Sequence, residues 1–236
     1  MKREYCKWFS GALGRDMELL VFGHGGVPVI VYPTSGGRFF EFEVNGMVHA
    51  VEQQIEAGSL QLFCIDSVNA ESWYNLGVPP RWRIARYMQF ETYVMDEVLP
   101  LVRQWNGQDR PVAAGCSLGG YDAACIALRH PTVFRGFLSM SGIFDPSRFL
   151  HGYYDEDVYF HSPPHFLQNL HNHQELAKYS GNIYVLATGD HDQCLHANER
   201  MSDVLRGKNI AHRLEVWGHG TRHDWPWWQQ MVQTYL

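Results

Sequence analysis

The sequence predicts an α/β fold, with a mostly parallel central sheet and helices on both of its faces. Apolar runs of strand length alternate with stretches of helical spacing along the chain. Several of these runs are apolar at every position, which is typical of strands buried on both faces. The chain has 236 residues, 45% of them hydrophobic, and neither an internal repeat nor a low-complexity linker. We therefore expect a single domain over residues 1–236.

The first third of the chain supplies three strands and one helix. A strand is predicted at 17–23 (MELLVFG), with HGG at 24–26 as the turn that follows it. The apolar runs VPVIVYP at 27–33 and LQLFCID at 60–66 predict two buried strands. Between them, VHAVEQQIEAG at 48–58 has helical spacing and stops at a glycine.

The middle of the chain continues the alternation. Residues 83–105 have a helical pattern, and Pro100 inside it predicts a kink or break because proline lacks the amide hydrogen that a helix needs. RPVAAG at 110–115 predicts a short central strand. LGGYDAACIALRHP at 118–131 predicts a helix that ends before its proline.

The last third of the chain adds three strands and two helices. The strands are predicted at 134–142, 182–189 and 212–218. The helices are predicted at 197–209 and 225–236, and the second of these is rich in tryptophan.

Residues 143–180 interrupt the alternation of strands and helices. The segment is rich in Tyr, His, Phe and Pro, and we expect a short cap-like insertion over the top of the sheet. Two interpretations stay open for its aromatic side chains, which either line a pocket or pack the insertion onto the domain: Tyr153, Tyr154, Tyr159 and Phe160. Its histidines lack the spacing of a metal motif, so we expect no metal there: His161, His165, His171 and His173.

Composition narrows the function classes. The formal net charge is −6 and no Lys/Arg-rich run occurs, which argues against nucleic acid or an anionic membrane surface as a partner. No stretch is long enough to span a bilayer, and the N-terminus lacks the apolar segment of a signal peptide, so we expect a cytoplasmic protein. The five cysteines are widely spaced without a CxxC motif, which argues against a disulfide scaffold or a structural zinc site.

The stretch GCSLG at 115–119 matches the pattern GxSxG, with Ser117 at its centre. The pattern alone is a weak signal, but here it lies between a predicted strand and a predicted helix, as a nucleophilic serine on a strained turn requires. Residues two before and two after such a serine crowd each other, and Gly115 and Gly119 are small enough. The alternative of a nucleotide-binding loop is disfavoured, because neither a P-loop nor a GxGxxG motif occurs at this turn.

A serine hydroxyl is a good nucleophile only when a base takes its proton and an acid orients that base. In folds of this kind the chain order is Ser, then the acid, then His. Asp190 and Asp192 follow the predicted strand at 182–189, and the residues alone leave both open as the acid. His219 and His223 lie in the loop before the last helix, and His223 is favoured because it ends that loop. An oxyanion hole would combine two backbone N–H groups. These are the amide of Leu118 and one from YPTSGG at 32–37.

Four parts of the chain resemble the α/β-hydrolase esterases of the esterase D type, which include S-formylglutathione hydrolases, feruloyl esterases and mycolyltransferases. The matching segments are SGALGRDMEL at 10–19, YPTSGG at 32–37, GCSLGGYDAA at 115–124 with FLSMSGIFDP at 137–146, and GHGTRHDWPWWQQM at 218–231. Together they run nearly from end to end of the chain. The resemblance implies the α/β-hydrolase fold, with the insertion at 143–180 over the active site.

The resemblance also implies individual site residues. The family pattern Gly-x-x-Asp selects Asp192 rather than Asp190, and Ser35 supplies the second oxyanion N–H group. Pro33 and Thr34 stand where relatives carry His-Gly, so the chain departs from the family pattern in this loop. The side chains expected to contact the substrate are those at or near these motifs and in the insertion: Thr34, Gly36, Cys116 and Tyr154.

The activity that the resemblance implies is that of a serine carboxylesterase acting on small-molecule esters of short acyl chains. Ser117, His223 and Asp192 would form the catalytic triad, with an acyl-enzyme intermediate and neither metal nor organic cofactor. Relatives are often homodimers. The alternatives are a thioesterase of the S-formylglutathione hydrolase kind or an acyltransferase. A catalytically silent binding protein is the alternative from another class, and the short insertion disfavours a peptidase.

Overall fold

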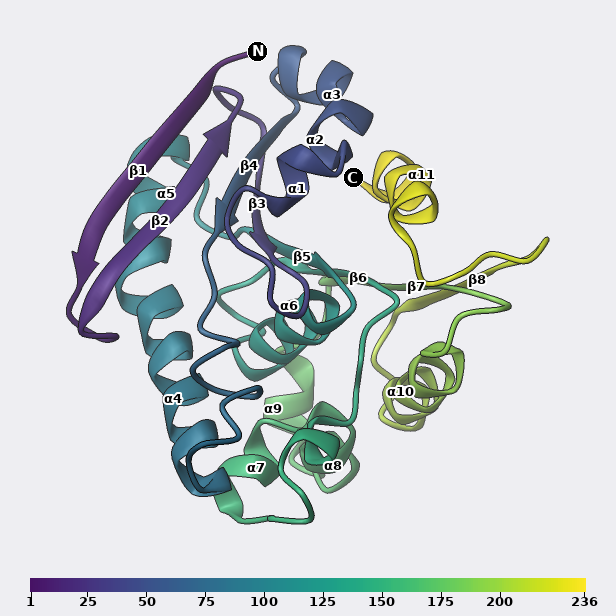
Figure 1. The fold of residues 1–236 in the computed structure, drawn as a ribbon. Helices are drawn as coiled ribbons and strands as arrows, with labels where there is room; N and C mark the ends of the chain where they lie inside the picture. The colour runs from purple at the N-terminus through teal and green to yellow at the C-terminus, as the bar shows by residue number, and fades with distance from the viewer.

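The computed structural model describes residues 1–236 and contains one eight-stranded sheet with the strand order β1-β2-β4-β3-β5-β6-β7-β8 (Figure 1). The strands are β1 (Arg3–Ser10), β2 (Arg15–Phe22), β3 (Val27–Tyr32), β4 (Leu60–Ile65), β5 (Val112–Cys116), β6 (Gly136–Met140), β7 (Ile183–Gly189) and β8 (Arg213–Trp217). Strands β3 to β8 run parallel to one another, whereas β1 pairs antiparallel with β2, and β2 with β4. The mostly parallel sheet predicted from the sequence is confirmed.

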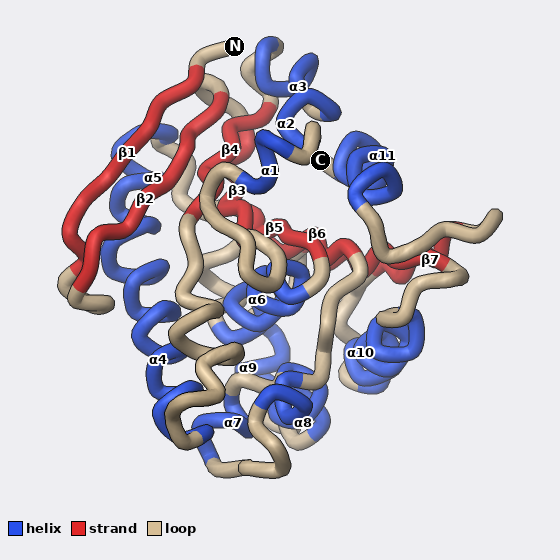
Figure 2. Tube along the Cα trace, in the orientation of Figure 1, coloured by secondary structure: helices blue, strands red, loops and turns tan.

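Helices cover both faces of the sheet. They are α1 (Glu41–Val44), α2 (Met47–Ala50), α3 (Glu52–Glu56), α4 (Pro80–Tyr93), the π-helix η1 (Val94–Val98), α5 (Leu99–Asn106), α6 (Leu118–Arg129), the 3-10 helix η2 (Pro146–Phe149), α7 (Glu156–Phe160), α8 (Pro163–Gln168), α9 (His173–Ala177), α10 (Leu195–Gly207) and α11 (Trp225–Tyr235). In Figure 2, α1, α2, α3 and α11 lie on one face of the sheet, and α4, α5, α6 and α10 lie on the other.

The strands alternate their side chains between two apolar clusters, one on each face. In β3, Val29 and Val31 belong to the cluster that contains the buried residues of α11, while Ile30 and Tyr32 belong to the cluster that contains those of α6. Both faces are therefore buried, which explains why these strands are apolar at every position rather than at every second one.

Three elements differ from the sequence prediction. The first strand, β1, was not predicted, because it is an edge strand whose exposed side chains break up any apolar run. The helix predicted at 48–58 is divided among α2 and α3, with Val51 at a φ of −115° between them. The helix predicted at 83–105 contains the π-helical turn η1 just before Pro100, since proline cannot donate an ordinary helical hydrogen bond.

Residues 143–180 form the short helices η2, α7, α8 and α9, which lie at the bottom of Figure 1. They pack against α4, α6 and α10, and Leu150, Val158 and Leu167 join the core cluster on that face. The segment therefore forms an outer layer on one side of the sheet. Its first residue comes close to the serine turn, since the Ile143 amide donates to the Ser117 carbonyl at 3.3 Å. None of the helices is both long and apolar enough to cross a membrane.

Candidate active site

Ser117 lies at the sharp turn between β5 and α6. Its φ of 56° and ψ of −119° are conformations that a residue with a side chain rarely adopts. The Ser117 amide donates to the Met140 carbonyl of β6 at 2.8 Å, and the residues of α6 from Leu118 to Leu128 are all buried. The hydrogen bond to β6 and the burial of α6 after the turn hold this strained turn in place. The Ser117 side chain is therefore oriented before any substrate binds.

Two glycines make this turn possible. A Cβ atom on Gly115 would lie 2.3 Å from the Gly119 carbonyl oxygen, and one on Gly119 would lie 2.4 Å from the carbonyl oxygen of Tyr32. The crowding that the sequence predicted around Ser117 is therefore confirmed. The second contact also brings the loop after β3 directly against the serine turn.

His223 lies between Ser117 and Asp192. Its Nε2 atom is 2.9 Å from Ser117 Oγ, and its Nδ1 atom is 3.0 Å from Asp192 Oδ1. When the carboxylate is ionised it can only accept, so the Nδ1 atom carries the hydrogen and Nε2 is left to accept the serine proton. This geometry is the one that a serine nucleophile with a general base requires.

Asp192 is buried, yet its surroundings favour the charged form. Burial alone would raise the pKa of its carboxyl group, but interactions with His223, the Ser141 hydroxyl and the Cys194 amide outweigh burial and hold the pKa below its ordinary value. The Cys194 amide donates to Oδ1 at 2.7 Å, whereas Oδ2 has no hydrogen-bond partner within 3.5 Å. The carboxylate is therefore ionised at neutral pH and ready to orient His223.

The loops that carry Asp192 and His223 are tied to each other. The Asp190 amide donates to the Trp217 carbonyl at 2.8 Å, and the His191 amide donates to the Thr221 carbonyl at 3.0 Å. A Cβ atom on Gly189 would lie 2.2 Å from that same Thr221 oxygen, so the approach requires glycine. These backbone contacts set the distance between the acid and the histidine.

The two alternative residues lie elsewhere. Asp190 is exposed, and its Oδ2 atom accepts the Gly220 amide at 3.3 Å rather than a histidine. His219 is exposed at a φ of 65°, and its side chain makes no hydrogen bond. Of the candidates that the residues alone left open, only Asp192 and His223 come together with Ser117.

Two backbone amides near Ser117 are free to bind a negatively charged oxygen. The Leu118 amide is the first of α6, where a helix leaves its N–H groups without partners and where its dipole favours negative charge. In the loop after β3, the Thr34 amide donates to Glu41 at 2.8 Å, whereas the Ser35 amide makes no hydrogen bond. Glu41 also accepts the Thr34 hydroxyl at 2.6 Å, so this carboxylate fixes the loop that replaces the His-Gly of relatives.

The four residues expected to contact substrate differ in their exposure and in their hydrogen-bond partners. Thr34 has its hydroxyl occupied by Glu41, and Gly36 is exposed with a φ of 73°. Cys116 is 1% exposed and belongs to the core cluster beneath α11, so its side chain faces the core and not a substrate. The reason is the alternation along β5, which turns the residue before Ser117 to the opposite face. Tyr154 is 49% exposed, and its hydroxyl lies 2.8 Å from His165 Nδ1.

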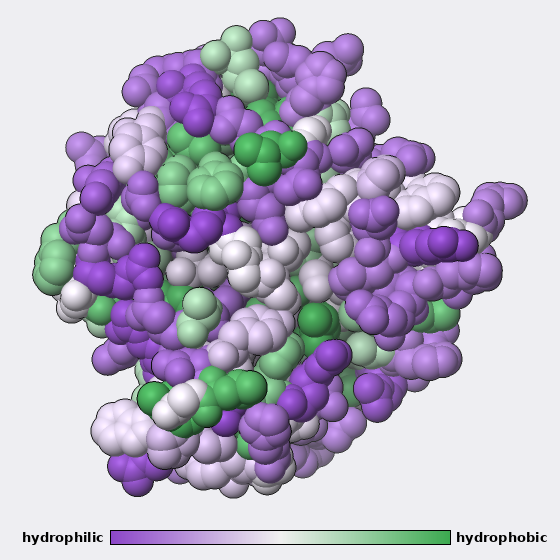
Figure 3. All heavy atoms as spheres, viewed as in Figure 1, coloured by the Kyte–Doolittle hydropathy of each residue, from purple (hydrophilic) through white to green (hydrophobic).

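Sequence reasoning missed a contact between Tyr74 and the candidate oxyanion loop. The Tyr74 hydroxyl donates to Ser35 Oγ at 2.7 Å, which brings the loop between β4 and α4 against the loop after β3. In Figure 3 the hydrophobic side chains on this face lie in several separate groups, with hydrophilic side chains between them. No local pattern marks Tyr74, since its role depends on a contact between residues 39 positions apart.

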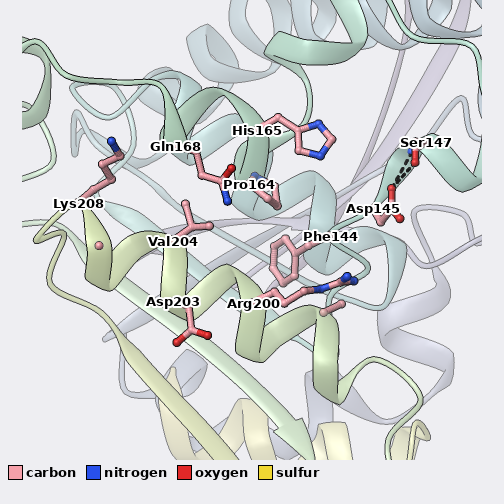
Figure 4. A pocket seen from close by; sticks show the side chains of 12 residues that line it. Phe144, Asp145, Ser147, Pro164, His165, Gln168, Arg200, Asp203, Val204 and Lys208 are labelled. Atoms are coloured by element: carbon pink, nitrogen blue, oxygen red, sulfur yellow. Dashed lines mark hydrogen bonds between the residues drawn. The ribbon is translucent and has the colours of Figure 1, made fainter.

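A pocket of about 610 Å³ lies between α8, α10 and the chain just after β6. Figure 4 shows Phe144 at its centre, with His165 and Gln168 from α8 on one side and Arg200 from α10 on the other. None of the three hydrogen-bonded site residues lines it. Phe144, which lines the pocket, directly follows Ile143, whose amide donates to the Ser117 carbonyl. The pocket therefore lies next to the site and does not contain it.

One group of side chains could in principle hold a metal ion. Ligand atoms of Asp192, Cys194 and His223 lie within 4.8 Å of one another. Burial raises the pKa of the Cys194 thiol to about 12, so the thiol keeps its proton and is a poor ligand at neutral pH. The same Asp192 and His223 atoms are already hydrogen-bonded to each other, which favours the proton-transfer arrangement over metal binding.

Comparison with known proteins gives the same picture. The model of a family described as "Putative esterase" matches residues 10–235. A ferulic acid esterase structure is 17% identical, covers 100% of this chain and 96% of its own, and has a TM-score of 0.80. An S-formylglutathione hydrolase from Agrobacterium tumefaciens is 17% identical, covers 99% of this chain and 92% of its own, and has a TM-score of 0.77. MPT51 (FbpC1) from Mycobacterium tuberculosis is 16% identical, covers 99% of this chain and 96% of its own, and has a TM-score of 0.74. No curated protein matches the sequence.

Proposed function

The chain belongs to this esterase family, and from that premise we propose that it is a serine carboxylesterase whose catalytic residues are Ser117, His223 and Asp192. The observation that carries the proposal is the hydrogen-bonded series from Ser117 Oγ through His223 to Asp192, with distances of 2.9 and 3.0 Å. The substrates are small-molecule esters.

The reaction proceeds through an acyl-enzyme. Ser117 Oγ attacks the ester carbonyl carbon while His223 Nε2 takes the hydroxyl proton, and Asp192 stabilises the imidazolium that forms. Collapse of the tetrahedral intermediate breaks the bond to the leaving alcohol, which receives the proton from His223. Water then attacks the acyl group with His223 again as the base, and Ser117 is regenerated with its proton.

The developing negative charge on the carbonyl oxygen needs donors that are already in place. We assign this role to the amides of Leu118 and Ser35, both free of other hydrogen bonds. Removing one such donor from an enzyme of this type typically costs about 3 kcal/mol of transition-state stabilisation. Glu41 acts indirectly, because its two hydrogen bonds to Thr34 fix the loop that presents the Ser35 amide.

The exposed Tyr74 ring, held beside Ser35 by a hydrogen bond between their hydroxyls, supports an apolar acyl group as the part of the substrate bound there. The family resemblance supports three further proposals. These are a preference for short acyl chains, a single domain in which the insertion at 143–180 acts as a cap, and a homodimer. A cytoplasmic location is also a proposal, supported by five cysteines that are all unpaired. The absence of a nucleic-acid partner stays a prediction from the net charge of −6. Thioesterase and acyltransferase activities use the same residues and remain the alternatives.

The test is hydrolysis of p-nitrophenyl esters from acetate to long acyl chains by wild type, Ser117→Ala and Ser180→Ala. Ser180 is exposed and its hydroxyl makes no hydrogen bond, so its variant controls for the loss of a serine hydroxyl. We expect turnover highest for short chains, lost in Ser117→Ala and retained in Ser180→Ala. Labelling with a fluorophosphonate, followed by mass spectrometry, should modify Ser117 alone. Equal turnover in wild type and Ser117→Ala would overturn the proposal.

A further inference from the structure

We propose that Trp228 is a positioning residue for the triad, acting on His223 with its ring and on Asp192 through Ser141. The proposal rests on the function proposed above. Trp228 lies on α11, 4% exposed, and contacts His223 and Ser141. Neither Trp228 nor Ser141 takes part in the proton transfers of the proposed reaction.

The first contact is a hydrogen bond through the indole. Trp228 Nε1 donates to Ser141 Oγ at 2.9 Å, and both side chains are buried. An indole N–H is only a donor, so the Ser141 oxygen must be the acceptor. The Ser141 hydroxyl hydrogen is therefore free to point to a different acceptor.

The second contact is between Ser141 and Asp192. Asp192 Oδ2 is buried and has no partner within 3.5 Å, and an unpaired carboxylate oxygen in the interior is costly. The Ser141 hydroxyl is among the groups that lower the pKa of Asp192, although no hydrogen bond joins the two side chains in the structure. Trp228 orients Ser141 and leaves the Ser141 hydroxyl hydrogen free to turn toward the one oxygen of Asp192 that His223 and Cys194 leave unused.

The backbone at Ser141 has a strained conformation. Its φ of 57° lies in the left-handed region, which a residue with a side chain rarely adopts, although a glycine, Gly142, is the next residue. The Ser141 amide donates to the Ala187 carbonyl of β7 at 2.7 Å, which anchors it beside the strand that leads to Asp192. Strain at a non-glycine residue persists only where surrounding contacts hold it, and here the hydrogen bonds to Ala187 and from Trp228 hold Ser141.

The third contact is between aromatic rings. The Trp228 and His223 rings meet edge to face, with centroids 4.9 Å apart and planes at 83°. This packing limits rotation of the imidazole about its side-chain bonds. One side chain thereby restrains the histidine and, through Ser141, the carboxylate that orients it. The ionisable groups that face Asp192 are His223 and Cys194, and the Cys194 thiol is neutral at working pH because burial raises its pKa to about 12.

The variants that test this are Trp228→Phe, which keeps a ring against His223 but removes the N–H donor, and Ser141→Ala, which removes the hydroxyl. Trp225→Phe is the matched control, since Trp225 lies on the same helix, packs against Trp228 with centroids 5.0 Å apart, and makes no side-chain hydrogen bond. Thermal melting checks that each variant is folded. The double variant Trp228→Phe/Ser141→Ala tests whether the two residues act in series.

We expect kcat/KM to fall about tenfold in Trp228→Phe and in Ser141→Ala, since each removes support for a charged group, and to change less than about twofold in Trp225→Phe. The double variant should be no worse than Ser141→Ala alone. The acid limb of the pH profile should move to higher pH in both single variants. Without the Ser141 donor, the Asp192 carboxylate attracts the imidazolium proton more strongly, and the protonated form persists further.

A second readout does not depend on turnover. The His223 Nδ1 proton, hydrogen-bonded to Asp192, should give a downfield proton NMR signal in wild type and in Ser117→Ala. We expect it to shift or broaden in Trp228→Phe and Ser141→Ala and to persist in Trp225→Phe. This separates the two proposals, since an inactive wild type that shows the same NMR pattern would contradict only the proposed function. Equal losses in Trp228→Phe and Trp225→Phe, with an unmoved acid limb and an unchanged NMR signal, would overturn the positioning role.

Discussion

Asp192 and Asp122 are both buried aspartates, 6% and 1% exposed, and their surroundings give them opposite charge states. Asp192 accepts hydrogen bonds from His223 and from the Cys194 amide, which hold its pKa below the ordinary value against the effect of burial. Asp122, on α6, has no partner for either oxygen within 3.5 Å. Burial raises the pKa of Asp122 to about 8, and the Tyr87 hydroxyl opposes this rise.

The difference shows that burial alone does not decide whether a carboxyl group is charged. Both groups lose contact with water, but only one regains hydrogen bonds in exchange. A third acid, the partly buried Glu91, fits the rule. Burial would raise its pKa, but hydrogen bonds from His130 and His161, 2.5 and 2.7 Å away, and the charge of Arg129 together hold it far below the ordinary value. Asp192 and Glu91 stay charged because the fold supplies each of them with donors.

The largest effect is expected for Asp192→Asn. An asparagine amide can donate where the carboxylate only accepts, so it no longer holds the hydrogen on His223 Nδ1. We expect kcat to fall about 10⁴-fold for a short-chain p-nitrophenyl ester, with an unchanged circular dichroism spectrum. A loss of less than tenfold would show that Asp192 is not the acid of the triad.

Glu91→Gln should be the next largest, and its effect is on stability. The substitution removes the negative charge of the carboxylate that His130, Arg129 and the insertion residue His161 all contact. Breaking such a partly buried network costs about 3 kcal/mol. Urea unfolding at pH 7 would measure this, with Glu175→Gln on the exposed helix α9 as a control.

The pH dependence of Glu91 has a definite sign. Because its folded pKa lies below the ordinary value of 4.5, its contribution to stability is present above about pH 4.5 and is lost as the pH falls further. The Gln variant lacks that contribution at every pH. The stabilities of wild type and variant should therefore converge in acid, and a difference that stays constant down to pH 3 would contradict this account.

Asp122→Asn is expected to raise stability, in contrast to the two substitutions above. Folded Asp122 keeps its proton up to about pH 8, whereas the unfolded chain loses it near the ordinary value of 3.8. The free energy of unfolding therefore falls as the pH rises across that window, and the neutral amide avoids the fall. We expect a gain in the free energy of unfolding that is present at pH 8 and absent at pH 4, measured by urea unfolding. Activity should be unchanged, because Asp122 contacts neither His223 nor Ser117.

Asp190→Asn should have the smallest effect. Asp190 is exposed, and its hydrogen bond to the Gly220 amide is 3.3 Å long. An exposed interaction of this kind contributes less than about 1 kcal/mol, so kcat/KM should change less than about threefold. A loss as large as that of Asp192→Asn would mean that the two aspartates exchange roles in solution.

The parts of the site that could be predicted are those encoded by short stretches of chain. Gly115, Ser117 and Gly119 lie within five residues, and the steric reason for the glycines holds for any turn of that shape. The favoured histidine followed from its place at the end of a loop. The residues alone could not separate Asp190 from Asp192, because both follow β7 and only the family pattern selected one.

The sequence by itself determined the order of the buried strands, the serine turn and the family, because hydrophobic periodicity and steric crowding act between near neighbours. Only the tertiary structure decided which aspartate meets His223, which amides stay free, and that Cys116 faces the core. It also decided that Trp228 and Ser141, 87 positions apart, share a hydrogen bond beside Asp192. Such contacts depend on how separate strands and helices pack together, and so does the supply of donors that makes one buried aspartate charged and leaves the other neutral.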